Sequence, residues 1–263
     1  MASTAMSNAL ADIRKGIQMH RVWIALAYEE VGNQHRRTAL GPIWLFLNYL
    51  AFAGTFIFVF QRGDSGVANY SAYVATGLLV WFLIMETFSQ SVAVFVRSEG
   101  FIKGTRLPLS VYVMQQSVQL LIRAGYASGG CLVILAFGGV SISAEAAWAF
   151  VGALVIVGTI PAVVILVGFL GAFFPDSQYI ISNAMRIGMF LTPVFWINAD
   201  SGIRQTLYFI NPFTYYIEIF RYPIVYQEVH WGALYFCVTL GLILWTAALF
   251  VLGSCSRKLV FVI

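Results

Sequence analysis

Charged side chains are scarce in this sequence. Asp, Glu, Lys and Arg together make up 10% of its 263 residues, whereas a soluble globular domain averages about 25%. Hydrophobic residues make up 60%, and the mean hydropathy is +0.83. This composition excludes a soluble globular enzyme and a disordered protein, and it indicates an integral membrane protein.

Residues that carry chemistry are equally few. The three cysteines have no CxxC spacing, which argues against a disulfide-rich secreted domain. The three histidines are scattered over both predicted sides of the membrane, so we expect no metal site. The sequence has neither a GxxxxGK[ST] phosphate loop nor a GxSxG nucleophile motif. We therefore expect no catalytic residues and no cofactor in this chain, and any uphill transport would draw its energy from a partner or an ion gradient.

What the sequence has in abundance is long apolar runs. A bilayer core needs about 20 mostly apolar residues per helix, and six stretches qualify. They cover residues 43–60, 70–95, 111–137, 147–174, 178–197 and 232–253. We expect an all-α integral membrane protein with six transmembrane helices. Residues 1–42 would form a cytoplasmic interface segment, and residues 43–263 would form one transmembrane domain.

The few basic residues are distributed unevenly over the connections between these spans. Ten of them would share one side of the membrane, and only three would lie on the other. The ten are Arg14, Lys15, Arg21, Arg36, Arg37, Arg97, Lys103, Arg106, Arg257 and Lys258, against Arg62, Arg204 and Arg221. Because cytoplasmic loops retain Lys and Arg, both termini are predicted to be cytoplasmic. The net charge of +4 then reflects the orientation of the chain in the membrane, and we expect no nucleic acid as a partner.

The N-terminal segment carries apolar residues at helical spacing. Leu10, Ile13, Ile17 and Ile24 recur on one face, with charged residues on the others. This pattern favours an amphipathic helix in the cytoplasmic interface. A basic patch that contacts anionic lipid is the alternative.

The stretch between spans five and six is long yet rich in apolar and aromatic residues. A free aqueous loop would not carry so many of them, and Asn211-Pro212 interrupts the stretch. The pattern predicts short re-entrant helices, which are tolerated where protein covers the irregular backbone. Such helices often form an external gate.

Three charged residues, Glu86, Arg123 and Arg186, fall inside the spans. A charge at the centre of a helix costs about 2.5–3.5 kcal/mol on insertion scales, so each should face protein or water. At 1.5 Å per residue their depths from the cytoplasmic end are roughly 14, 18 and 12 Å. We expect Glu86 to pair with Arg123 or Arg186 beside a polar path. A purely structural ion pair is the alternative.

Aromatic residues make up 16% of the chain. Their flat faces can stack on sugar rings, and several lie within or at the ends of the first three spans. The candidates for lining a carbohydrate path are Trp44, Tyr49, Phe52, Trp81, Phe88 and Tyr126. Interface belts and ordinary packing are the alternatives.

Several short motifs follow one another in a definite order. They are 36–44 (RRTALGPIW) before the first span, 106–109 (RLPL) after the basic loop, 192–196 (TPVFW) at the end of the fifth span, and 211–212 (NP) followed by Arg221. With six spans and this length, the sequence resembles the permease subunits of ABC-2 polysaccharide exporters over nearly the whole chain.

The resemblance implies a homodimer joined to two cytoplasmic ATPase subunits, which would bind ATP and Mg. The complex would sit in the bacterial inner membrane among its lipids and export an O-antigen, capsule or teichoic-type polysaccharide, often as a glycolipid. The coupling helix toward the ATPase would be Ser98, Glu99, Gly100, Phe101, Ile102 and Lys103, and the periplasmic gate would include Asn211, Pro212 and Arg221.

Other functions compete with this one. The segment 98–106 also fits a plain positive-inside loop. An ABC-2 exporter of a lipid or drug would have a less aromatic path. A membrane-embedded glycosyl- or acyltransferase would need clustered polar groups at one membrane face. An ion-coupled transporter would show inverted repeats and midplane carboxylates, for which only Glu86 is a candidate.

Overall fold

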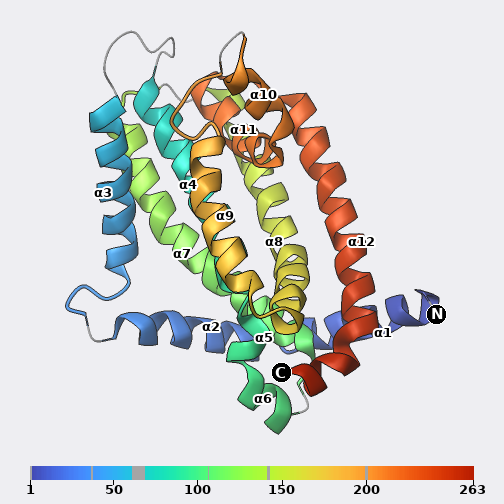
Figure 1. Cartoon of the computed structure of the whole chain (residues 1–263). Helices are drawn as coiled ribbons and strands as arrows, with labels where there is room; N and C mark the ends of the chain where they lie inside the picture. Colours follow the sequence, from blue (N-terminus) through green and yellow to red (C-terminus); the bar gives the residue numbers. More distant parts are fainter. Residues whose placement is uncertain (1, 37, 61–68, 106, 141–142, 199–200) are drawn as a thin grey trace.

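The computed structural model describes residues 2–36, 38–60, 69–105, 107–140, 143–198 and 201–263. Within these ranges the chain is helical and contains no strand. Five helices are long and apolar enough to cross a membrane, and they run side by side in Figure 1. They are α3 (Ile43–Phe60), α4 (Tyr70–Ser91), α7 (Leu109–Phe137), α8 (Trp148–Phe173, preceded by the 3-10 turn η1, Ala144–Ala147) and α12 (Trp231–Val262). The prediction of an all-helical, multi-pass membrane protein is therefore confirmed.

The predicted fifth span differs from the other five. Helix α9 (Ser177–Leu191) has 15 residues, which corresponds to about 22 Å, whereas the hydrocarbon core is about 30 Å thick. It ends before Pro193 because a residue that precedes proline disfavours helical backbone, and Thr192 is extended, with ψ 141°. Five of the six expected spans are thus long enough, and the span 178–197 stays a prediction.

Two helices lie across one end of the bundle, which we call the base (Figure 1). They are α1 (Ala2–Gln18) and α2 (His20–His35), separated by a break at Met19. The carboxylate of Asp12 accepts hydrogen bonds from the backbone N–H groups of Ser110 and Leu109 at 2.9 and 3.2 Å. Asp12 thereby caps the first turn of α7 from another helix, which fixes α1 to the bundle.

The predicted second span is interrupted near its end. Helix α4 stops at Ser91, and two short helices, α5 (Val94–Arg97) and α6 (Glu99–Gly104), continue the chain below the base. At the interruption α8 approaches unusually closely: a Cβ built on Gly171 would lie 1.8 Å from the carbonyl oxygen of Val92. Only glycine at position 171 allows this approach.

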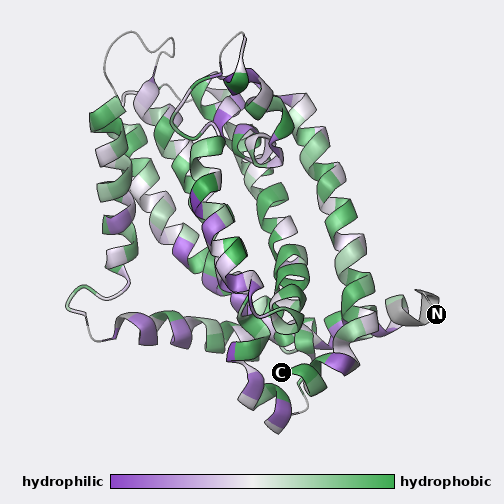
Figure 2. Cartoon of the chain, viewed as in Figure 1, coloured by the Kyte–Doolittle hydropathy of each residue, from purple (hydrophilic) through white to green (hydrophobic). Residues whose placement is uncertain are grey.

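Two further helices cover the end opposite the base. They are α10 (Ile203–Ile210) and α11 (Pro212–Val225), and α11 packs against α4, α8 and α12. The hydropathy colouring shows apolar residues along the long helices and polar ones in α2 and α6 (Figure 2). Many large apolar side chains stay exposed on the bundle surface, such as Phe137 at 91%, as a lipid-facing surface requires.

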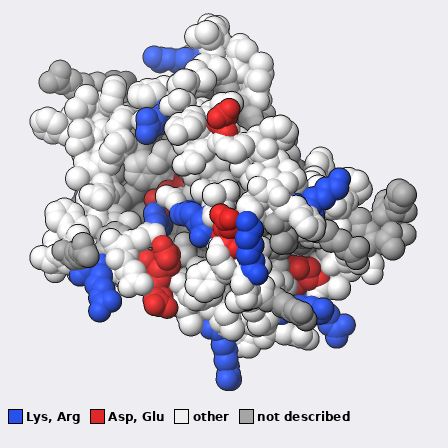
Figure 3. Space-filling model, turned by 60° about the horizontal axis from the view of Figure 1, so that its bottom comes forward, with Lys and Arg blue, Asp and Glu red and all other residues white. Residues whose placement is uncertain are grey.

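Charged side chains gather around the base, where both termini also lie (Figures 1 and 3). This matches the side that the sequence predicts to be cytoplasmic. Three of the basic residues in that charge count, Arg37, Arg62 and Arg106, lie outside the described residues.

Candidate functional site

An intramembrane ion pair joins α4 to α7. Arg123 Nη1 lies 3.9 Å from Glu86 Oε2, which is one of the two pairings that depth along the helices predicts. Both side chains are largely but not completely buried, at 15% and 30% exposed. Arg186 takes no part in the pair, because it lies on an exposed face of α9. The pair ties two spans together at one height.

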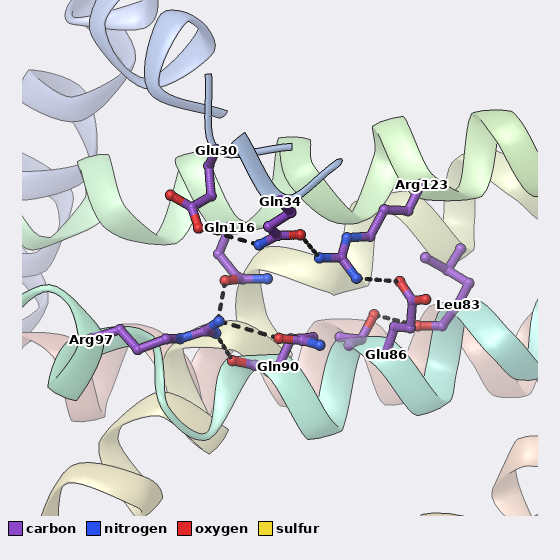
Figure 4. Close-up of polar contacts among 9 residues, drawn as sticks. Glu30, Gln34, Leu83, Glu86, Gln90, Arg97, Gln116 and Arg123 are labelled. Atoms are coloured by element: carbon purple, nitrogen blue, oxygen red, sulfur yellow. Dashed lines mark hydrogen bonds and ion pairs between the residues drawn. The ribbon is translucent and has the colours of Figure 1, made fainter. Parts of the chain in front are cut away.

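The ion pair continues into the interface helix α2 (Figure 4). The guanidinium of Arg123 also donates a hydrogen bond to Gln34 Oε1, and Gln34 Nε2 donates to Glu30 Oε1 at 3.2 Å. A chain of four polar side chains therefore connects the end of α2 with Glu86, five residues before the end of α4. Gln34 has no specific sign in the sequence, since a polar residue near a membrane surface is ordinary.

A second arginine reaches back toward the same region. Arg97, at the end of α5, donates from Nη1 to Gln90 Oε1 at 3.2 Å and from Nη2 to Gln116 Oε1 at 3.3 Å. Desolvation lowers the pKa of Arg97, and the nearby carboxylate of Glu30 opposes this shift. The charge pattern predicts Arg97 only as a loop charge, whereas its side chain joins α5 to α4 and α7.

An aromatic pocket adjoins the ion pair between α3, α4 and α7. Its volume is about 200 Å³, and Tyr49, Phe52 and Phe82 line it together with Glu86 and Arg123. The ring of Phe52 meets that of Phe82 at a centroid distance of 5.2 Å. Two of the predicted path residues, Tyr49 and Phe52, thus lie beside the predicted ion pair.

The other four aromatic candidates lie elsewhere. Trp44 is exposed, and Tyr126 is half-buried. Trp81 is completely buried, and Phe88 lines a separate apolar pocket between α4, α8, α11 and α12. Only two of the six candidates therefore share one cavity, and a role for the others in a path stays a prediction.

The predicted coupling segment forms a short helix that projects below the base (Figure 1). Ser98 precedes α6, and Gly100 is exposed within it. Lys103 pairs with Glu99 at 2.8 Å. Ile102 packs into a core cluster at the base. Phe101 points the other way and is 63% exposed.

The predicted gate residues surround the start and middle of α11. The Asn211 side chain accepts a hydrogen bond from the Phe213 N–H at 3.0 Å and donates one to Thr192 Oγ1 at 2.7 Å. Pro212 occupies the first turn of α11, where its missing N–H costs nothing. These contacts hold α11 against the chain that leaves α9.

Arg221 is the most buried charged residue that the structure describes. Its side chain is 0% exposed, and its Nη1 lies 3.3 Å from Glu218 Oε1. Its Cζ lies 3.8 Å from the centroid of the Tyr73 ring, and Nη2 donates to Val194 O at 3.4 Å. A Cβ on Gly77 would lie 2.1 Å from Nη2, so glycine makes room for the guanidinium. Charge pattern alone placed Arg221 in a loop and gave no sign of this burial.

Among the described residues, no group of three His, Cys, Asp or Glu side chains could hold a metal ion. No family model matches the sequence, and no curated protein matches it either. Membership of a family therefore stays a prediction that rests on the short motifs.

Proposed function

We propose that this chain is the permease subunit of an ATP-driven ABC exporter that moves a lipid-linked polysaccharide across a bacterial inner membrane. Two copies would form the channel, and two cytoplasmic ATPase subunits would bind ATP and Mg. The observation that carries the proposal is α6, a short helix that projects from the base and exposes Phe101 while Ile102 anchors it.

The position of α6 suits the transmission of force. Through α5 it continues from α4, and through residues 105–108 it leads into α7. Those two helices carry Glu86 and Arg123. A displacement of α6 by a bound ATPase would therefore act on both partners of the intramembrane ion pair.

The remaining features support the same function. Helices α1 and α2 cross the base as interface helices would, and we place the base on the cytoplasmic side because Lys and Arg gather there. Helices α10 and α11 cover the opposite end, where we expect the periplasmic gate. The aromatic pocket beside the ion pair suits a sugar better than a purely apolar ligand.

The test is the substitution Phe101→Glu in the chain co-expressed with an ABC-type ATPase from the same genome that the unsubstituted chain captures. Loss of a central aromatic contact weakens an interface by about 2 kcal/mol or more, which is roughly 30-fold in affinity. Capture of the ATPase should therefore fall steeply. The melting temperature of the permease should not change, because Phe101 is mostly exposed.

Phe261→Glu is the matched control, since Phe261 is an equally apolar side chain that is exposed near the end of α12. This variant should capture the ATPase normally. Normal capture by Phe101→Glu, or equal losses in both variants, would overturn the assignment of α6 as the docking helix.

A further inference from the structure

A large cavity with both polar and apolar lining residues lies at the base. Its volume is about 450 Å³, within the range of small-molecule sites, and α2, α5, α6 and α7 enclose it. Three glutamines of α7, Gln115, Gln116 and Gln119, line one wall. Residues three and four apart share a helix face, so these amides form a ladder along α7.

Gln119 and Gln116 are the buried members of the three. Gln119 is 6% exposed, and within the described ranges its side-chain amide has no hydrogen bond. Gln116 is equally buried; its Oε1 accepts from Arg97 at 3.3 Å, and its amide nitrogen donates to no described group. Both residues line the cavity, and each keeps hydrogen-bonding groups that no described residue occupies. A ligand in the cavity could therefore both accept hydrogen bonds from these amides and donate to them.

The charges of the described lining residues disfavour an anionic ligand. Glu29 and Glu30 line the cavity on the α2 side, and Arg97 is the basic side chain among the described lining residues, so together these residues carry a formal charge of −1. Arg97 is already engaged by Gln90 and Gln116. A phosphate would meet more repulsion than attraction here.

A sugar ring fits this lining. Its hydroxyl groups donate and accept, as the glutamine amides do, and its C–H face can pack on the ring of Tyr112 in the cavity wall. A basic side chain from a partner protein fits less well, because it accepts no hydrogen bond and would leave the amide N–H groups of the glutamines unpaired.

The aromatic pocket is lined from the same helix, one turn further along α7. Arg123 lies four residues beyond Gln119, one turn further along α7, and Leu120 and Arg123 line the aromatic pocket. A ligand that leaves the glutamine ladder along α7 would therefore meet the ion pair with Glu86 and then Tyr49 and Phe52.

We propose that this cavity is a binding site for one sugar unit of the exported polysaccharide, with Gln119 and Gln116 as its hydrogen-bonding residues. The assignment rests on the proposed function, because an exporter of polysaccharide is what would bring sugar rings to the base. It would be the first binding site on a path whose aromatic residues lie one helical turn further along α7.

The test uses the full chain in lipid nanodiscs, with methyl α-glucoside, methyl α-mannoside and N-acetylglucosamine as probes and saturation-transfer NMR as the readout. Gln119→Met keeps the length of the side chain and removes the amide. Loss of one hydrogen-bonding group should weaken binding of the best probe about tenfold. The melting temperature should change little, because the Gln119 amide has no hydrogen bond to a described residue that the substitution could remove.

Gln178→Met is the matched control, since Gln178 is exposed on α9, away from the cavity, and it should leave probe binding unchanged. Methylguanidinium serves as the competing probe for a partner's basic side chain. Absence of glycoside binding, equal binding by Gln119→Met, or a site that takes methylguanidinium alone would each overturn the proposal.

The binding test needs no ATPase, so it is separable from the docking test. If sugar binding depends on Gln119 but no ATPase is captured, the sugar site is supported and only the exporter function is overturned. Normal ATPase capture without any sugar binding overturns the site and leaves the exporter function standing. Because Phe101 also lines the cavity, the variants at Gln119 rather than Phe101 decide this question.

Discussion

The buried pair of Arg221 and Glu218 gives a quantitative test of how the outer end of the bundle is held. We consider Arg221→Met, which keeps most of the side-chain volume and removes the charge. The carboxylate of Glu218 is almost fully buried, and its Oε2 has no hydrogen-bond partner even with Arg221 present. Removal of Arg221 therefore leaves a buried carboxylate with no cation to compensate it.

The expected loss of stability follows from the contacts that Arg221 makes. Breaking a buried ion pair by removing one partner costs about 3–5 kcal/mol. The contact between Arg221 and the ring of Tyr73 adds about 0.5–2 kcal/mol. The bond to Val194 is long at 3.4 Å and adds little. We expect Arg221→Met to lower the free energy of unfolding by about 4 kcal/mol.

The double variant Glu218→Met with Arg221→Met should recover most of this loss, because replacing both members of a buried pair with apolar residues is often neutral. Unfolding of the purified protein in mixed micelles, followed by far-UV circular dichroism, gives the four free energies of the cycle. A loss below about 1 kcal/mol for Arg221→Met, or two single losses that simply add, would refute a tightly coupled buried pair.

Two further predictions concern the base and the middle of the bundle. Asp12→Ala should lower the free energy of unfolding by about 1 kcal/mol because it uncaps α7. Asp176→Ala is the control, since Asp176 lies at the start of α9 and its side chain makes no capping bond. It should leave the free energy of unfolding unchanged in the same micelle experiment. Glu86→Gln should lower polymer export while the amount of assembled complex stays the same, since a partly exposed pair at 3.9 Å contributes about 1 kcal/mol or less to stability. Equal falls in export and assembly would instead assign the pair a structural role.

Most of the long helices could be predicted from the sequence because their signal is local. Helices α3, α7, α8 and α12 begin within two residues of their expected starts, since a run of about 20 apolar residues has few alternatives. The contact between Glu86 and Arg123 could also be predicted from the sequence, because the rise per residue places both residues at similar depth. In each case the helix geometry alone carries the information.

The features that could not be predicted from the sequence depend on contacts between segments that are distant along the chain. Residues 89–95 contain neither proline nor glycine, so the end of α4 at Ser91 has no local cause, and Gly171 of α8 lies directly against it. The end of α9 does have a local sign in Thr192-Pro193, because the residue before a proline disfavours helical backbone. The burial of Arg221 depends on Gly77 and Tyr73, more than 140 residues earlier in the chain.

The hydrogen bond between Gln34 and Arg123 has a mechanical meaning that depends on the lipid. With α2 at the membrane surface, as we propose, its height follows the headgroups, whereas the height of Arg123 is set by the span that carries it. A thicker or thinner bilayer would shift one relative to the other and strain this one bond. The geometry of the ion pair between Arg123 and Glu86 would then change with bilayer thickness, and therefore with the chain length of the lipids.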